Sequence, residues 1–136
     1  MRAILDPNVI ISALLSPKGA PARALREWLH GRFELVVSPL LLEELARALA
    51  YPKLRKHIEP EEARRIVELL ATSATVAADP KDPPSVRSAD PGDDYLIALA
   101  EAESAALVSG DDHLLGLQED IPVFASSRFL RLLEAE

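Results

Sequence analysis

The stretch Ala105-Ala106-Leu107-Val108-Ser109-Gly110-Asp111 is a short apolar run that ends in an acidic residue, and Arg2-Ala3-Ile4-Leu5-Asp6 has the same pattern at the start of the chain. Strands with one solvated face alternate apolar and polar residues, and neither of these runs does so. Short continuous apolar strands are typical of parallel sheets that helices cover on both faces. Ligands of such sheets bind at the carboxyl ends of the strands, which is where Asp6 and Asp111 fall.

The rest of the chain continues this alternation of short strands and helices. Ser38 and Pro39 supply an N-cap and a proline at the first helical position, and Tyr51-Pro52 ends the same helix. We therefore predict an α/β fold, a single three-layer domain over residues 1–136 with a central parallel sheet of about five strands. The apolar stretch Val9–Leu15 lies between the first strand and the first helix, and Asp79–Asp90, with three prolines, is a loop. The expected strands are Arg2–Asp6, Glu34–Val37, Ala74–Ala78, Ala105–Ser109 and Pro122–Ala125, and the expected helices run from about Pro21 to His30, Pro39 to Ala50, Pro60 to Thr72, Asp93 to Ser104, Asp112 to Leu117, and from a cap at Ser126 or Ser127 to Glu134.

Composition limits the class of protein. With 136 residues, 49% of them hydrophobic, the chain can bury one core. No apolar run approaches the roughly 18 to 20 residues of a membrane helix, so we expect a cytoplasmic protein without a membrane partner. The chain has no cysteine, and its three histidines lack metal-ligand spacing, so any bound metal is oxygen-ligated. The scarcity of thermolabile side chains beside eleven prolines indicates a thermophile source.

Glu44 lies beside the apolar stripe of its helix, where a solvated acid is rare. At about 100 degrees per residue, the leucines between residues 41 and 49 form the stripe, and Glu44 falls at its edge. The neighbouring Glu43 points further round the helix and is spaced i,i+4 from Arg47, the spacing of a surface ion pair. Glu43 is therefore an ordinary surface acid and Glu44 is the unusual one.

Asp93 and Asp94 differ in the same way. The apolar residues of Leu96–Ala100 form one face of their helix, and Asp93 projects onto that face. Asp94 shares the opposite side with Glu101, so we expect it to be a surface acid that holds nothing. The same positions also allow a simpler interpretation, in which Asp93 is only an N-cap and Asp111 only a capping residue after a glycine turn.

Folding could bring Asp6, Glu44, Asp93 and Asp111 together at one edge of the sheet. Carboxylates at such short distances repel one another. A bound divalent cation, which prefers oxygen ligands, offsets this repulsion. The combination predicts a Mg²⁺ or Mn²⁺ site that hydrolyses phosphodiester bonds.

The charge of the chain is unevenly distributed. The net charge is −7, which argues against binding to nucleic acid, and residues 89–126 contain neither lysine nor arginine. Positive charge is instead concentrated between Arg47 and Arg65. These cations are either solvated helix faces or a basic rim that holds a polyanion while a metal neutralises the acidic site. The candidates for such an RNA-binding rim are Arg47, Lys53, Arg55 and Lys56.

Four ordered blocks, spread over the chain from residue 2 to residues 129–130, resemble the motifs of PIN domains, ribonucleases that include the toxins of VapBC-type toxin–antitoxin pairs. Ile4–Leu15 resembles the Asp-Thr-Asn-Val opening of these proteins, Ser38–Leu45 matches the segment with their second acid at Glu44, Asp90–Ala100 matches the third acid at Asp93, and Leu107–Leu115 matches their Val-Thr-Gly-Asp block at Asp111.

This resemblance implies a ribonuclease in which Asp6, Asp93 and Asp111 hold Mg²⁺ or Mn²⁺ directly or through waters. Glu44 would take a second ion or orient the attacking water. The implied partners are an RNA substrate, an antitoxin protein and a second copy of the chain in a homodimer.

Asn8 and Ser109 are expected to hydrogen-bond around these metal ligands, and two positions depart from the family pattern. His113 stands where many members carry another acid, which favours one well-held metal over two. Pro7 replaces the usual threonine and removes a hydroxyl and an amide donor beside the metal. The alternative is therefore a PIN-like module that binds RNA or protein with little or no catalytic turnover.

Overall fold

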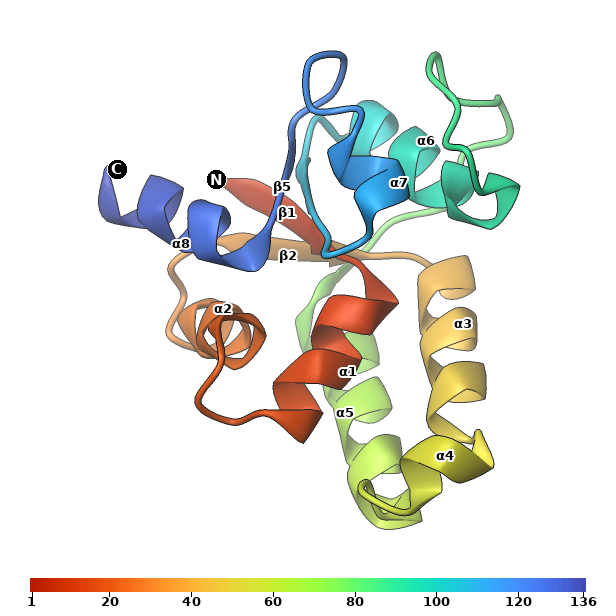
Figure 1. Cartoon of the computed structure of the whole chain (residues 1–136), viewed down its shortest axis with the longest axis vertical. Helices are drawn as coiled ribbons and strands as arrows, with labels where there is room; N and C mark the ends of the chain where they lie inside the picture. The colour runs from red at the N-terminus through yellow and green to blue at the C-terminus, as the bar shows by residue number, and fades with distance from the viewer.

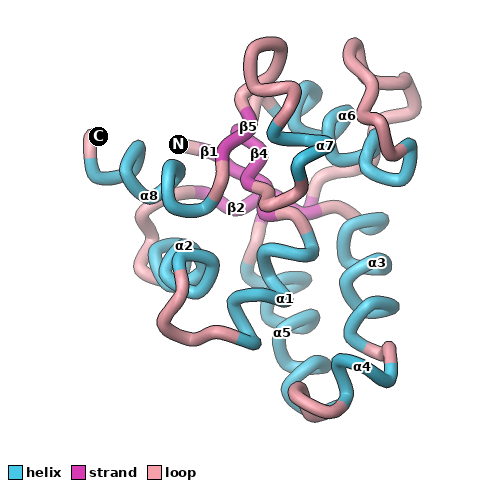
Figure 2. The backbone as a smooth tube through the Cα atoms, viewed as in Figure 1, coloured by secondary structure: helices cyan, strands magenta, loops and turns pink.

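The computed structural model describes all of residues 1–136, and its centre is a five-stranded sheet in the order β3-β2-β1-β4-β5 (Figure 1, Figure 2). Every neighbouring pair of strands is parallel, which confirms the predicted α/β fold with a parallel sheet. The strands are shorter than predicted at one or both ends, except β2. Their bounds are Arg2–Leu5 for β1, Glu34–Val37 for β2, Thr75–Val76 for β3, Ala106–Val108 for β4 and Val123–Phe124 for β5.

Helices cover both faces of this sheet. Figure 1 shows α1, α3 and α5 on one side of the sheet and α6 and α7 on the other. α1 packs against α2 and α3, α3 packs against α5, and α8 packs against α2. None of the helices is long and apolar enough to span a membrane. Their bounds are Pro7–Leu15 for α1, Ala20–Leu29 for α2, Pro39–Leu49 for α3, Pro52–Arg55 for α4, Pro60–Ser73 for α5, Asp94–Glu103 for α6, Asp112–Leu115 for α7 and Ser126–Glu134 for α8, with a 3₁₀ turn η1 at Pro91–Asp93.

The central strands are buried on both faces. Ala3–Leu5, Leu35–Val37 and Leu107–Val108 are each at most 1% exposed. Successive side chains of a strand point to opposite faces, so this continuous burial requires a packed layer on each side. The apolar runs of the sequence therefore predict the sheet correctly, because the burial they indicate does not alternate.

Two helices were missing from the sequence prediction. The apolar stretch Val9–Leu15 belongs to α1, which begins at Pro7. Tyr51-Pro52 does end α3, but Pro52 also opens the short helix α4. Both errors have one cause: a proline at the first position of a helix needs no amide donor, so the same residue stops one element and starts the next.

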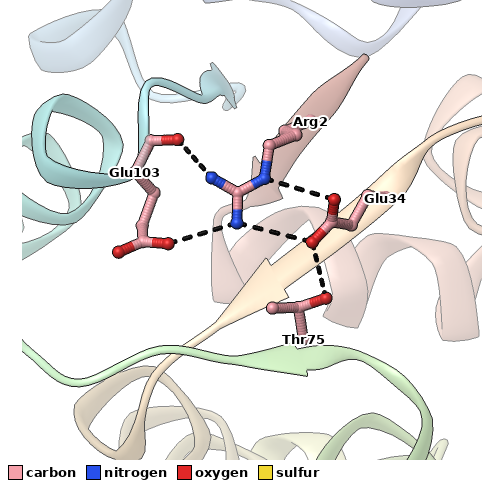
Figure 3. Close-up of polar contacts among 4 residues, drawn as sticks. All are labelled: Arg2, Glu34, Thr75 and Glu103. Carbon is pink, nitrogen blue, oxygen red and sulfur yellow. Dashed lines mark hydrogen bonds and ion pairs between the residues drawn. The ribbon is translucent and has the colours of Figure 1, made fainter.

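Arg2 ties four elements together at the amino end of the sheet (Figure 3). Its guanidinium donates to both carboxylate oxygens of Glu34 on β2, at 3.3 and 3.4 Å, and to Oε1 of Glu103 at 3.2 Å. It also donates to the backbone carbonyl of Glu103 at the end of α6. Thr75 of β3 donates to Glu34 Oε2 at 2.7 Å, and this bond, with those of Arg2, holds the pKa of Glu34 below its usual value. Both acids of this network, Glu34 and Glu103, thus have partners.

The proline-rich loop after β3 folds back onto α6, and this corrects the prediction for Asp94. Asp94 Oδ1 accepts a hydrogen bond from the Ser88 amide at 2.8 Å, and Oδ2 lies 3.4 Å from the Arg87 guanidinium. Its side chain is only 15% exposed. Glu101, two turns further along the same face, accepts bonds from the amide and the hydroxyl of Ser85. The side of α6 opposite the core therefore holds a loop, and Asp94 is not the free surface acid that helical periodicity predicts.

Candidate metal centre

Asp6 is a buried carboxylate at the carboxyl end of β1. It is 3% exposed and acts as the N-cap of α1. Its Oδ1 accepts a hydrogen bond from the Asn8 amide at 3.0 Å, and its Oδ2 accepts one from the Ser109 hydroxyl at 2.8 Å. Burial raises the pKa of Asp6, and the charges of Glu44 and Asp111 add to this increase, although the two hydrogen bonds act against it.

Ser109 connects Asp6 to Asp111. The strand pairing places Leu5 beside Val108, and the Asp6 amide donates to the Val108 carbonyl at 2.9 Å, so the residues after both strands meet at one edge. The Ser109 hydroxyl donates to Asp6 and accepts from the Asp111 amide at 3.0 Å. A fully buried hydroxyl that bonds in both directions holds the two segments in a fixed relation.

Asp111 caps α7, as the simpler interpretation of the sequence allowed. Its Oδ1 accepts a hydrogen bond from the His113 amide at 2.9 Å, and the His113 ring nitrogen Nδ1 lies 3.6 Å from the same oxygen. Capping uses only one of its two carboxylate oxygens. Asp111 can therefore cap a helix and still present an oxygen to a ligand.

Asp93 lies at the end of η1, in the N-cap position of α6, but its side chain makes no capping hydrogen bond. Its Oδ2 is buried and has no hydrogen-bond partner. The pKa of Asp93 is raised to about 7, first by burial and then by a hydrogen bond with the Asp111 carboxyl and by the charges of Asp111, Asp6 and Asp90. Such a bond between two carboxyls needs a proton on one of them. At neutral pH Asp93 is therefore about half protonated.

Glu44 is half-buried in the middle of α3, as its place beside the apolar stripe predicts. Glu43 pairs with Arg47 at 3.0 Å on the outer side of the same helix, also as predicted. The Tyr95 hydroxyl, from α6, donates to Glu44 Oε2. Burial and this bond raise the pKa of Tyr95, so it stays protonated and continues to donate.

Tyr95 is a site residue that sequence reasoning missed. The signal was present, because Tyr95 carries the only hydroxyl in the run Asp94–Ala100, where the other residues after Asp94 are apolar and buried. A buried tyrosine hydroxyl usually finds a partner, and the partner here is a residue of another helix, 51 positions away.

The four acids are close enough for their charges to act on one another. Asp6 and Asp111 are the N-caps of α1 and α7, Glu44 lies in α3, and Asp93 ends η1. Beside Asp111 lies a cleft of about 290 Å³, lined by Asn8, Ser12, Gly110 and Ser126 among others. No three acidic or histidine side chains are arranged as a closed cation site. The donor set nevertheless fits a hard divalent cation in kind, because it consists of carboxylate oxygens and includes the buried, unpartnered Oδ2 of Asp93.

The basic segment lies further from these acids than predicted. Figure 1 shows α4, which carries Lys53 and Arg55, at the end of α3 that points away from the sheet. Arg47 is paired with Glu43, while Arg64 pairs with Glu61 and Glu68 and Arg65 with Glu61. Arg55 lines a separate groove of about 270 Å³ between α3 and α5. Three of the six cations between residues 47 and 65 thus form helix-surface ion pairs, as the solvated-face interpretation expects.

Known proteins resemble this chain in sequence and in fold. A family model described as PIN domain matches residues 2–113. The uncharacterized protein MJ1680 of Methanocaldococcus jannaschii is 30% identical over 122 residues, which cover 88% of this chain and 77% of that protein. VapBC2 from Rickettsia felis, solved bound to a DNA fragment from its promoter, has a TM-score of 0.61 at 15% identity, over 91% of this chain and 97% of that chain. FitAcB from Neisseria gonorrhoeae has a TM-score of 0.55 at 20% identity, over 92% and 98%.

Proposed function

This chain belongs to the PIN domain family, and we propose that it is a metal-dependent ribonuclease that hydrolyses RNA phosphodiester bonds. The observation that carries the proposal is the buried, unpartnered Oδ2 of Asp93, which lies near the carboxyl of Asp111 and the buried Asp6. Acids in such an arrangement are costly to the fold unless a cation binds them. Perturbed carboxyls beside a cleft are a recognised mark of a functional site.

Asp6, Asp93 and Asp111 would hold Mg²⁺ or Mn²⁺, with Glu44 nearby. When bound, the cation lowers the pKa of a water and stabilises the negative charge that develops on the phosphate. Asp6 needs no reorganisation for this role, because Ser109 and the Asn8 amide already fix both of its oxygens. Asp93, whose pKa is raised to about 7, would lose any proton it holds on taking this role.

Glu44 would orient the attacking water. Tyr95 engages Oε2 of Glu44 and leaves Oε1 without a partner in the protein, so the carboxylate is held by one oxygen and can accept a hydrogen bond from water with the other. Tyr95 remains protonated, which keeps the donor in place. In this role Tyr95 is a positioning residue.

Pro7 does not weaken this proposal. It occupies the first turn of α1, where an amide would have no partner within the helix. Asp6 retains the Asn8 amide and the Ser109 hydroxyl as donors. The presence of Pro7 is therefore a weak argument for a binding module with little turnover. That function remains one outcome of the test below.

The resemblance to the toxins of VapBC-type toxin–antitoxin pairs, with which the folds of VapBC2 and FitAcB agree, supports a second part of the proposal. In it the chain is a cytoplasmic toxin, is bound and inhibited by an antitoxin protein, and forms a homodimer. Expression without the partner should arrest growth of the host cell. Expression of the Asp6→Asn variant should not.

The activity is tested by incubating the purified protein with single-stranded RNA and either EDTA, Mg²⁺ or Mn²⁺. We expect cleavage only with a metal, and its loss in Asp111→Asn. The matched control is Asp112→Asn, because Asp112 is the exposed neighbour of Asp111 on the same helix. RNA binding without cleavage in every metal would favour the binding module, and equal activity of the two variants would remove Asp111 from the site.

A further inference from the structure

The N-terminus of α8 lies at the same edge of the sheet as the carboxylates. The Ser109 amide donates to the carbonyl of Phe124 on β5 at 3.0 Å, and α8 begins two residues after Phe124. Ser126, its first residue, lines the cleft of about 290 Å³ together with Asp111 and Asn8. A ligand in this cleft would touch both the helix end and the candidate metal centre.

This helix end has no internal partner for its amides. Ala125, in the N-cap position, offers no side-chain acceptor, and the amides of Ser126, Ser127 and Arg128 make no hydrogen bond within the protein. The first turn contains no acid and does contain Arg128. A cation there is unfavourable next to the positive end of the helix dipole, and free amides bind anions well. The helix end is therefore suited to a negatively charged ligand.

Ser126 gives an independent indication of a ligand. The residue is 8% exposed, and its hydroxyl has no partner within the protein; unlike Oδ2 of Asp93, this oxygen is not cut off from solvent, so it opens to the cleft. The side-chain hydrogen bonds at this edge join Ser109, Asp6, Asp111 and the His113 amide, and none of them involves Ser126. Because Ser126 lines the cleft, an acceptor placed in the cleft would satisfy it.

We infer that the N-terminus of α8, with the Ser126 hydroxyl and the cleft in front of it, binds a phosphate group of the RNA strand next to the phosphate that is cleaved. The identification of the anion as RNA phosphate rests on the proposed function. Asp111 lines the same cleft, so a phosphate there is repelled unless a cation lies at the carboxylates. Phosphate and metal should therefore strengthen each other's binding.

The test places an acid or its neutral isostere at Ser127, which is exposed and so can change without repacking the core. An aspartate in the first helical turn suits the helix dipole, so Ser127→Asp should fold at least as well as the wild type while repelling phosphate. Ser127→Asn is the matched control of equal size. Amide chemical shifts of residues 126–128 are followed during titration with inorganic phosphate, with and without Mg²⁺. They are also followed with a short single-stranded RNA in EDTA, where no cleavage occurs.

We expect both phosphate and RNA to shift these amides, more tightly for phosphate when Mg²⁺ is present. Affinity should fall about tenfold or more in Ser127→Asp and change little in Ser127→Asn. Absence of a response to RNA, or equal binding by Ser127→Asp, would overturn the inference, and a response to phosphate alone would reduce the site to a general anion site. If RNA shifts the amides but the wild type cleaves no RNA with any metal, the nuclease proposal fails and the phosphate site stands.

Discussion

Replacing Asp93 by asparagine should stabilise the metal-free protein above neutral pH. The pKa of Asp93 rises from 3.8 to about 7 on folding, so the folded protein holds this proton more tightly than the unfolded chain. Stability from this group is full below pH 4 and is lost as the pH rises through about 7. For a fully buried group the difference corresponds to about 4 kcal/mol. Asp93 is only half-buried, so solvent screening reduces the expected effect to about 1–2 kcal/mol.

Asparagine has the shape of the protonated acid and can still donate to Asp111. In EDTA at pH 8, Asp93→Asn should therefore melt about 4 to 8 °C above the wild type, and at pH 4 the two should melt together. Added Mn²⁺ should reverse the order at pH 8, because the wild type gains more from a metal that it binds better. The exposed Asp112→Asn should follow the wild type at each pH and metal concentration. The reasoning is refuted if Asp93→Asn melts at or below the wild type at pH 8 in EDTA, or if the difference persists at pH 4.

Three further variants have distinct expected results. Tyr95→Phe removes the hydrogen bond to the carboxylate of Glu44, so kcat should fall about tenfold or more with KM little changed. An equal kcat would show that the Tyr95–Glu44 bond only joins α6 to α3. Asp94→Ala removes the carboxylate that binds Ser88 and Arg87 of the loop, so the free energy of unfolding in urea should fall by about 1–2 kcal/mol. An unchanged urea midpoint would show that Asp94 is an ordinary surface acid. Reversing the charges of Arg55 and Lys56 should weaken RNA binding and flatten its dependence on salt; if affinity is unchanged across a salt series, α4 is only a solvated face.

The fold and the general place of the acids could be predicted because one rule connects them. In a parallel sheet all strands end at the same edge, so an acid directly after each of two buried strands must lie near that edge. Asp6 and Asp111 follow this rule, and the bonds through Ser109 join them. Glu44 followed from helical periodicity, since its side of α3 faces the same region.

The sequence could not predict contacts between distant segments, because helix and strand periodicity does not determine how such segments pack against each other. Periodicity places Asp94 on the outer side of its helix, but only the tertiary structure shows that the proline-rich loop covers that side. The hydroxyl of Tyr95 and the free end of α8 are similar cases, since one finds its partner on another helix and the other has none. α4 was missed because a proline was taken only as a stop signal.

The two edges of the sheet also differ in how their acids are neutralised. At the amino edge Arg2 binds Glu34 and Glu103 through paired hydrogen bonds. At the carboxyl edge Asp6, Glu44 and Asp93 form no ion pair with any lysine or arginine, and Asp111 meets only the ring of His113. The chain has fifteen lysines and arginines, so the absence of a basic side chain at the carboxyl edge does not result from a shortage of such residues. Carboxylates that are partly or fully buried without a cationic partner cost free energy that a fold seldom retains without a use. A cation from solution would offset that cost, and the same cation would attract the phosphate for which the end of α8 is suited.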